Sequence, residues 1–103
     1  MTSHTAETPS EDPYVLGQYA LGYSQGGAFG PNPSVPMIGT TLKHWIGNNV
    51  EGGTGGPDRH TMDANISAYD LASSYMVGYE TAIKGGCLGI MCAYNSGRCL
   101  KKV

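Results

Sequence analysis

The stretch from Met37 to Asn49 constrains the fold more than any other part of this 103-residue chain. It begins as an apolar, β-branched run and changes at Lys43-His44 into polar and aromatic residues. A strand buried on both faces is a continuous apolar run, so polar side chains are tolerated only at its ends. We therefore expect a strand over residues 37–44 whose carboxyl end presents Lys43 and His44 to a pocket. A strand that runs into an ordinary polar surface loop would show the same pattern.

The clearest helix is expected over residues 68–84. Ser67 is suited to the N-cap, Asp70 stands three residues later as in a capping box, and Gly85-Gly86 supplies a C-terminal stop. The tyrosines of this segment are interpreted as packing residues, because they follow the apolar stripe. That stripe consists of Leu71, Tyr75, Met76, Tyr79, Ala82 and Ile83.

An earlier helix is expected over residues 13–25. Asp12-Pro13 reads as an N-cap followed by proline at the first helical position, and Gly26-Gly27 is expected to end the helix. Its predicted buried face consists of Val15, Leu16, Tyr19, Ala20 and Tyr23. Proline-rich residues 30–36 then connect it to the strand.

A second apolar run, residues 88–93, again ends in polar residues, beginning with Tyr94-Asn95. It predicts a second strand, preceded by a glycine-rich loop over residues 48–60, an extended segment at 61–66 and the helix described above. A strand, helix and strand in this order form a βαβ unit with parallel strands and a right-handed crossover. Lys43-His44 and Tyr94-Asn95 would then lie at the same edge of one sheet.

Composition excludes several classes of function. The formal charge of -2 and the lack of a clustered basic stripe give no indication of a nucleic-acid partner. No apolar run is long enough to span a membrane, and the polar residues 1–12 do not resemble a signal peptide. Cys87, Cys92 and Cys99 lack zinc-site spacing, so we expect no metal and no cofactor. Buried free thiols are the first interpretation, and a disulfide in an oxidising compartment is the other.

Three motifs in chain order resemble the N-terminal barrel domain of glycoside hydrolase family 3. Residues 7–13 (ETPSEDP), 43–45 (KHW) and 91–95 (MCAYN) are close to the family forms ETPGEDP, KHF and MCSYN. The resemblance covers residues 6–95, and the tail at 96–103 diverges from it. It implies an α/β fold in which residues 1–103 are a fragment of that domain. About two βα units of a (β/α)8 TIM barrel, with parallel strands, would be present.

The resemblance also implies a function. It indicates a secreted, retaining β-xylosidase or β-glucosidase that hydrolyses β-linked sugars in carbohydrate metabolism, including xylan catabolism. Lys43 and His44 would hydrogen-bond sugar hydroxyls, Tyr94 would lie near the reacting centre, Met91 would line the pocket, and Glu7 would support it. A pocket for sugars needs such fixed donors together with aromatic rings, for which Trp45 and Tyr94 are candidates.

Catalytic residues are not expected in this chain. Retaining hydrolysis requires two carboxyl groups about 5 Å apart, and the family places both after its third motif. Residues 96–103 contain no carboxylate side chain. Glu51 and Asp58 lie in the loop over residues 48–60, but neither is assigned as the nucleophile. The chain is therefore expected to hold substrate-pocket residues and to be inactive alone.

Two alternatives remain beside a glycosidase fragment. The chain would be a non-catalytic sugar-binding remnant, or a nonfunctional truncated product. In a full-length protein its partners would be the remainder of the barrel and a C-terminal domain. Without them the strands would expose unpaired edges, so we expect the isolated chain to be at best marginally folded.

Overall fold

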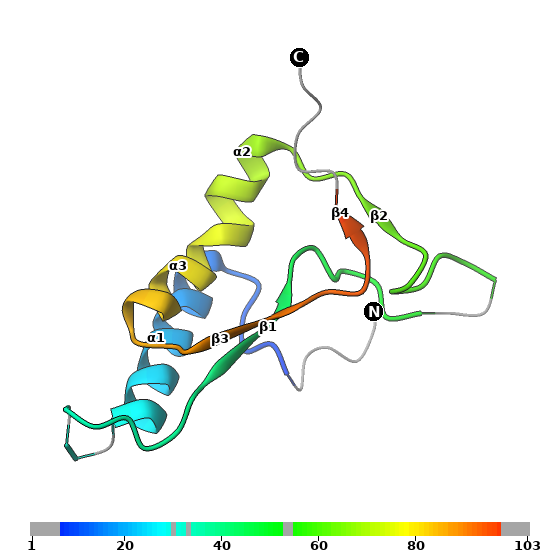
Figure 1. Ribbon diagram of the computed structural model, residues 1–103. Helices are drawn as coiled ribbons and strands as arrows, with labels where there is room; N and C mark the ends of the chain where they lie inside the picture. The colour runs from blue at the N-terminus through cyan, green and yellow to red at the C-terminus, as the bar shows by residue number, and fades with distance from the viewer. Residues whose placement is uncertain (1–6, 30, 33, 53–54, 98–103) are drawn as a thin grey trace.

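The computed structural model describes residues 7–29, 31–32, 34–52 and 55–97. Helices and short parallel strands alternate along these residues (Figure 1), which is compatible with part of an α/β fold. The elements are α1 (Pro13–Phe29), β1 (Thr41–Trp45), β2 (Asp63–Ala64), α2 (Ala68–Asp70), the π-helical segment η2 (Leu71–Tyr75), α3 (Met76–Lys84), β3 (Gly89–Cys92) and β4 (Ser96–Gly97).

The strands form two small parallel sheets. β1 pairs with β3, so that Thr41 lies opposite Gly89 and Leu42 opposite Ile90. This confirms the predicted parallel pairing of the two apolar runs, although both strands are shorter than expected. β2 pairs with β4 in a second sheet that the sequence did not indicate. In Figure 1 this second sheet lies away from α1 and α3, beyond the carboxyl ends of β1 and β3.

Helix α1 begins as predicted and ends four residues later. Asp12 Oδ1 accepts hydrogen bonds from the backbone N–H groups of Tyr14 and Val15, at 2.8 and 2.9 Å, which confirms the N-cap. The expected stop at Gly26-Gly27 is wrong. Two glycines lower helix propensity by only about 1 kcal/mol each. The last turn is held by tertiary packing, because it buries Ala28 completely.

The predicted apolar face of α1 is only partly correct. Val15, Tyr19 and Tyr23 are at least half exposed and Leu16 and Ala20 are partly buried, whereas the buried residues of the helix are Gly17, Ser24 and Ala28. Small residues occupy the buried face of α1 because this helix packs closely against α3. A β-carbon added to Gly17 would lie 3.2 Å from Thr81 Oγ1. Larger side chains on this face would separate the two helices, and the aromatic residues therefore point outward.

The helical stretch over residues 68–84 agrees with prediction at both ends. The Ser67 hydroxyl accepts from the backbone N–H of Asp70 at 3.0 Å and donates to its carboxylate at 2.7 Å. Gly85 forms the C-cap, and Gly86 follows with φ of 93°. The π-helical turn η2 in the middle was not expected, and it supplies Ser74 and Tyr75 to the site described below.

The core is small. Its buried apolar side chains are Ala28, Ile46, Ala64, Ile66 and Ala82. The expected burial of the second strand is wrong, because Leu88, Ile90 and Met91 are all more than 40% exposed. A sheet of only two strands offers few partners for packing, so these side chains stay partly exposed to solvent.

The cysteines are only partly as predicted. Cys87 and Cys92 are free thiols, but Cys92 is exposed and Cys87 only partly buried. The expectation of buried thiols is therefore wrong for both. Cys99 lies outside the described residues. No helix among residues 7–29, 31–32, 34–52 and 55–97 is long and apolar enough to cross a membrane.

Candidate functional site

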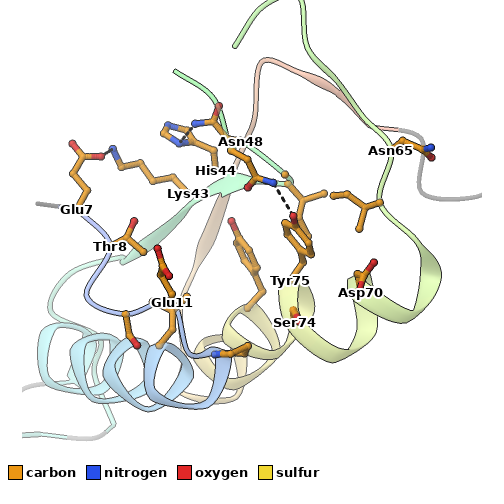
Figure 2. Close-up of a pocket in the computed structure, with 18 residues that line it drawn as sticks. Glu7, Thr8, Glu11, Lys43, His44, Asn48, Asn65, Asp70, Ser74 and Tyr75 are labelled. Atoms are coloured by element: carbon orange, nitrogen blue, oxygen red, sulfur yellow. Dashed lines mark hydrogen bonds and ion pairs between the residues drawn. The ribbon is translucent and has the colours of Figure 1, made fainter. Parts of the chain in front are cut away.

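A pocket of 660 Å³ opens beside the carboxyl end of β1 (Figure 2). Its walls come from the segment before α1, the end of β1 with the loop that follows, and the helical stretch over residues 68–84. Three of the five predicted substrate residues line it, namely Glu7, Lys43 and His44. The strand end therefore delivers its polar side chains to a cavity, as the sequence predicted.

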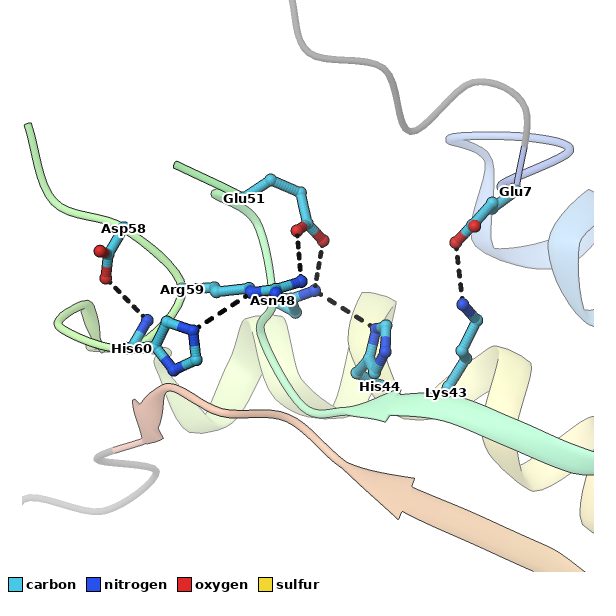
Figure 3. A network of polar contacts seen from close by, with 8 residues as sticks. All are labelled: Glu7, Lys43, His44, Asn48, Glu51, Asp58, Arg59 and His60. Atoms are coloured by element: carbon cyan, nitrogen blue, oxygen red, sulfur yellow. Dashed lines mark hydrogen bonds and ion pairs between the residues drawn. The ribbon is translucent and has the colours of Figure 1, made fainter. Parts of the chain in front are cut away.

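Lys43 forms an ion pair across the mouth of this pocket. Its ammonium nitrogen lies 2.9 Å from Glu7 Oε2, which joins β1 to the segment that precedes α1 (Figures 2 and 3). Both side chains are well exposed, 46% for Lys43 and 62% for Glu7, so the pair adds at most about 1 kcal/mol to stability. Its main effect is to orient the ammonium group, which has three N–H donors in total.

His44 is held by the loop that follows β1. The Asn48 side-chain amide nitrogen lies 3.3 Å from His44 Nδ1 and donates to Glu51 Oε1 at 3.2 Å (Figure 3). Glu51 also accepts from Arg59 Nη1 at 3.1 Å. The glycine-rich loop is therefore tied to the site by hydrogen bonds.

Two tyrosines that the sequence analysis interpreted as packing residues also form an aromatic wall of this pocket. Tyr75 and Tyr79 line the pocket, and Asn49 donates to the Tyr75 hydroxyl at 2.7 Å. Burial raises the pKa of Tyr79 to about 12, so its phenol stays neutral at physiological pH. Their spacing of four residues on a helix that follows the strand was the available signal.

Trp45 is not a pocket ring. Its indole packs edge-on against Tyr79, with ring centroids 4.8 Å apart, while the pocket lining passes from His44 to Ile46. Trp45 instead supports the Tyr79 side chain from β1.

Tyr94 and Met91 do not line the pocket with Lys43 and His44. Met91 is 51% exposed. The Tyr94 ring lies 5.1 Å from the Arg59 guanidinium carbon and 4.7 Å from the His60 ring. Their assignment as substrate residues therefore stays a prediction.

The loop carboxylates have structural partners. Asp58 Oδ1 accepts from the backbone N–H groups of His60 and Thr61, at 2.9 and 3.0 Å. The backbone hydrogen bond from His60 is the main reason that the pKa of Asp58 lies below its usual value. Glu51 bridges Asn48 and Arg59, as described above. Within the described part of the chain, no three His, Cys, Asp or Glu side chains are grouped to hold a metal ion.

Comparison with known proteins places the chain among homologues of glycoside hydrolases. It is 33% identical over 91 residues to the probable exo-1,4-β-xylosidase bxlB of Aspergillus clavatus, a match that covers 87% of this chain. Probable β-D-xylosidase 7 of Arabidopsis thaliana is 33% identical over 96 residues. An exo-α-(1→6)-L-arabinopyranosidase of Bifidobacterium longum is 37% identical over 87 residues. The resemblance to xylosidase-type glycosidases is therefore confirmed.

The match covers only a small part of these relatives. The chain spans 12% of the length of the Aspergillus and Arabidopsis proteins and 10% of the Bifidobacterium protein. No protein-family model matches the chain, and no solved structure matches it. The similarity is thus to one segment of each of these longer glycosidases.

Proposed function

We propose that this chain is a segment of the barrel domain of a family 3 β-xylosidase or β-glucosidase, and that it supplies part of the sugar-binding pocket. The observation that carries the proposal is the similarity to exo-1,4-β-xylosidases over 87% of the chain. The convergence of Glu7, Lys43 and His44 on one cavity supports it. The complete enzyme would be a secreted, retaining glycosidase acting in xylan catabolism.

The chemistry of the pocket suits a pyranose ring. Lys43 supplies a charged donor and His44 a ring nitrogen, while the Tyr75 hydroxyl can donate or accept. The rings of Tyr75 and Tyr79 offer the flat apolar surface that the C–H face of a sugar packs against. Polar groups fix the orientation of the sugar and aromatic groups supply most of the buried area.

The remaining predicted contacts depend on the family resemblance. Tyr94 would lie near the reacting centre, Met91 would line the pocket, and Glu7 would hold Lys43 in place. In the complete enzyme, further strands of the barrel and a C-terminal domain would complete the cavity beside β3. This fits the exposure of Met91 and Tyr94 in the segment alone.

No carboxylate of this segment is proposed as nucleophile or acid/base. Glu7 is paired with Lys43, and Asp70 is engaged at the N-cap of the second helical stretch. Glu51 and Asp58 hold the loop, as described above. We therefore propose that the segment binds the sugar and that the hydrolytic pair is external to it.

Sugar binding by the 103-residue chain tests the proposal. Methyl β-xyloside is titrated into the labelled protein and amide shifts are followed by NMR, for the wild type, Lys43→Ala and the control Lys84→Ala. Lys84 lies at the exposed end of α3, outside the pocket lining. A lost charge-assisted hydrogen bond should weaken binding about tenfold or more in Lys43→Ala and leave Lys84→Ala unchanged.

Hydrolysis of p-nitrophenyl β-xyloside by the same three proteins completes the test. We expect no turnover above buffer. Turnover that Lys43→Ala abolishes would show that a catalytic pair lies within the chain after all. Equal affinities of the wild type and Lys43→Ala would contradict the proposed pocket. No binding by a folded wild type would contradict it as well and favour a nonfunctional product.

A further inference from the structure

A series of contacts runs from the end of β3 to the end of β1. The Arg59 guanidinium lies over the Tyr94 ring at 5.1 Å, and Arg59 donates to Glu51 Oε2 at 3.1 Å. Glu51 Oε1 accepts from the Asn48 side-chain amide, which also lies 3.3 Å from His44 Nδ1. Figure 3 shows the part from Arg59 to His44. Tyr94 is thus connected to the pocket histidine without lining the pocket.

Glu51 decides which end of the Asn48 amide faces His44. An ionised carboxylate only accepts hydrogen bonds, so it selects the –NH2 group of Asn48 and repels the amide oxygen. Asn48 Oδ1 is buried and has no hydrogen-bond partner among the described residues. The hydrogen bond from Asn48 to the Glu51 carboxylate outweighs the missing bond at Asn48 Oδ1, because a hydrogen bond to a charged acceptor is about twice as strong as a neutral one.

The orientation of Asn48 in turn selects the tautomer of His44. The same –NH2 group has a second N–H, and its nitrogen lies 3.3 Å from His44 Nδ1, within reach of a hydrogen bond. Nδ1 must then carry the lone pair and act as acceptor. A neutral imidazole has one proton, so this proton lies on Nε2. The other tautomer would set two N–H groups against each other.

We propose that Glu51 is a positioning residue that fixes the Nε2–H tautomer of His44 through Asn48, and that Arg59, stacked on Tyr94, holds Glu51 in place. His44 then donates from Nε2 and recognises a sugar hydroxyl through its oxygen lone pairs. The sugar as ligand rests on the function proposed above, whereas the tautomer is a property of the chain alone. Tyr94 acts here through its ring and Arg59.

The tautomer is measured on the unliganded chain by two-dimensional NMR of the imidazole nitrogens. At about pH 9, histidine side chains are neutral. The chain has three histidines, and His44→Gln identifies the signals of His44. We expect Nδ1 to be unprotonated and Nε2 protonated in the wild type. A His44 that is mainly protonated at Nδ1 would overturn the proposal directly.

Variants separate the proposed coupling from the ordinary preference of a solvated imidazole. Asn48→Asp places an acceptor at Nδ1 and should reverse the tautomer. Glu51→Gln keeps the shape of the side chain but removes the preference of the carboxylate for the –NH2 group of Asn48. The ratio of the Nδ1–H to the Nε2–H tautomer of His44 should therefore rise about fivefold, as for the loss of one hydrogen bond. Asn49→Asp is the matched control, because Asn49 bonds Tyr75 instead, and it should leave the tautomer unchanged.

The stacking step has its own pair of variants. Tyr94→Phe keeps the ring beneath Arg59 and should preserve the wild-type tautomer ratio. Tyr94→Leu removes the ring and should move the ratio in the direction of Glu51→Gln. A ratio that is unchanged in Glu51→Gln, or in both Tyr94 variants, would refute the corresponding step. Failure of the proposed function would instead show as absent sugar binding with the tautomer intact.

Discussion

Adding one methyl group to Gly47 should destabilise the protein strongly. Gly47 has φ of 78°, and a β-carbon there would lie 2.8 Å from Ile66 Cδ1 and 3.1 Å from Ala64 Cβ. The left-handed backbone costs about 1–2 kcal/mol for a residue other than glycine. Ile66 and Ala64 are buried and cannot move freely, which adds about 1–3 kcal/mol of overpacking. Gly47→Ala should therefore lower the free energy of unfolding by about 2–5 kcal/mol.

The same substitution at Gly22 is the matched control. Gly22 lies inside α1, and a β-carbon there would meet no atom within 4 Å. Alanine should stabilise the helix by about 0.5–1 kcal/mol. Urea unfolding followed by far-ultraviolet circular dichroism gives both free energies. A cost of less than about 1 kcal/mol for Gly47→Ala, or a greater destabilisation by Gly22→Ala, would refute the predicted strain and overpacking at Gly47.

Three further predictions concern a titration, a cap and an exposed strand. Burial raises the pKa of Tyr79 from 10.0 to about 12, so the phenol is neutral in the folded and the unfolded chain below pH 10. The contribution of Tyr79 to the free energy of unfolding is therefore complete below pH 10 and is lost as the pH rises from 10 to 12. Absorbance titration of the wild type minus Tyr79→Phe should therefore show one phenol ionising near pH 12, and a difference near pH 10 would contradict its burial. Ser67→Ala removes both hydrogen bonds to Asp70 and should cost about 1 kcal/mol in thermal unfolding, whereas an unchanged melting temperature would argue against the cap. Ile90 is 42% exposed on β3, so sedimentation should show self-association that Ile90→Lys reduces, and a strictly monomeric wild type would speak against it.

Local signals in the sequence predicted local structure well. Asp12 and Ser67 act as N-caps as expected, and residues 68–84 are helical throughout. Hydrogen bonds at helix ends involve residues two or three positions apart, so they can be recognised without knowing the fold. The parallel pairing of β1 with β3 followed from their apolar runs and the helix between them.

Features set by distant contacts were not predicted. The buried face of α1 is decided by how closely α3 approaches, and periodicity alone pointed to the larger apolar residues instead. β2 and β4 have two residues each and carry no period. The bridge from Glu51 to Arg59 spans a loop without any helical or strand pattern.

The residues of the candidate site were likewise predicted only in part. Glu7, Lys43 and His44 were identified from sequence, and the structure brings them to one pocket. Tyr75 and Tyr79 were interpreted as packing residues, because the stripe of a helix does not show which of its members will border a cavity. Tyr94 was expected in the pocket, but its ring instead contacts the loop residues Arg59 and His60 and stays largely exposed.

The π-helical turn η2 has a consequence for insertions and deletions. A π-turn contains one residue more than the corresponding α-turn, so it behaves as an insertion that the helix has absorbed. Deleting Ser73 from Leu71–Tyr75 would leave a regular α-helix over this stretch. Because each α-helical residue turns the chain by about 100°, the segment before the deletion would rotate by that angle relative to α3. Asp70 would then no longer lie on the same wall of the pocket as Tyr79. The extra residue of the π-turn thus keeps Asp70 and Tyr79 on one wall of the pocket.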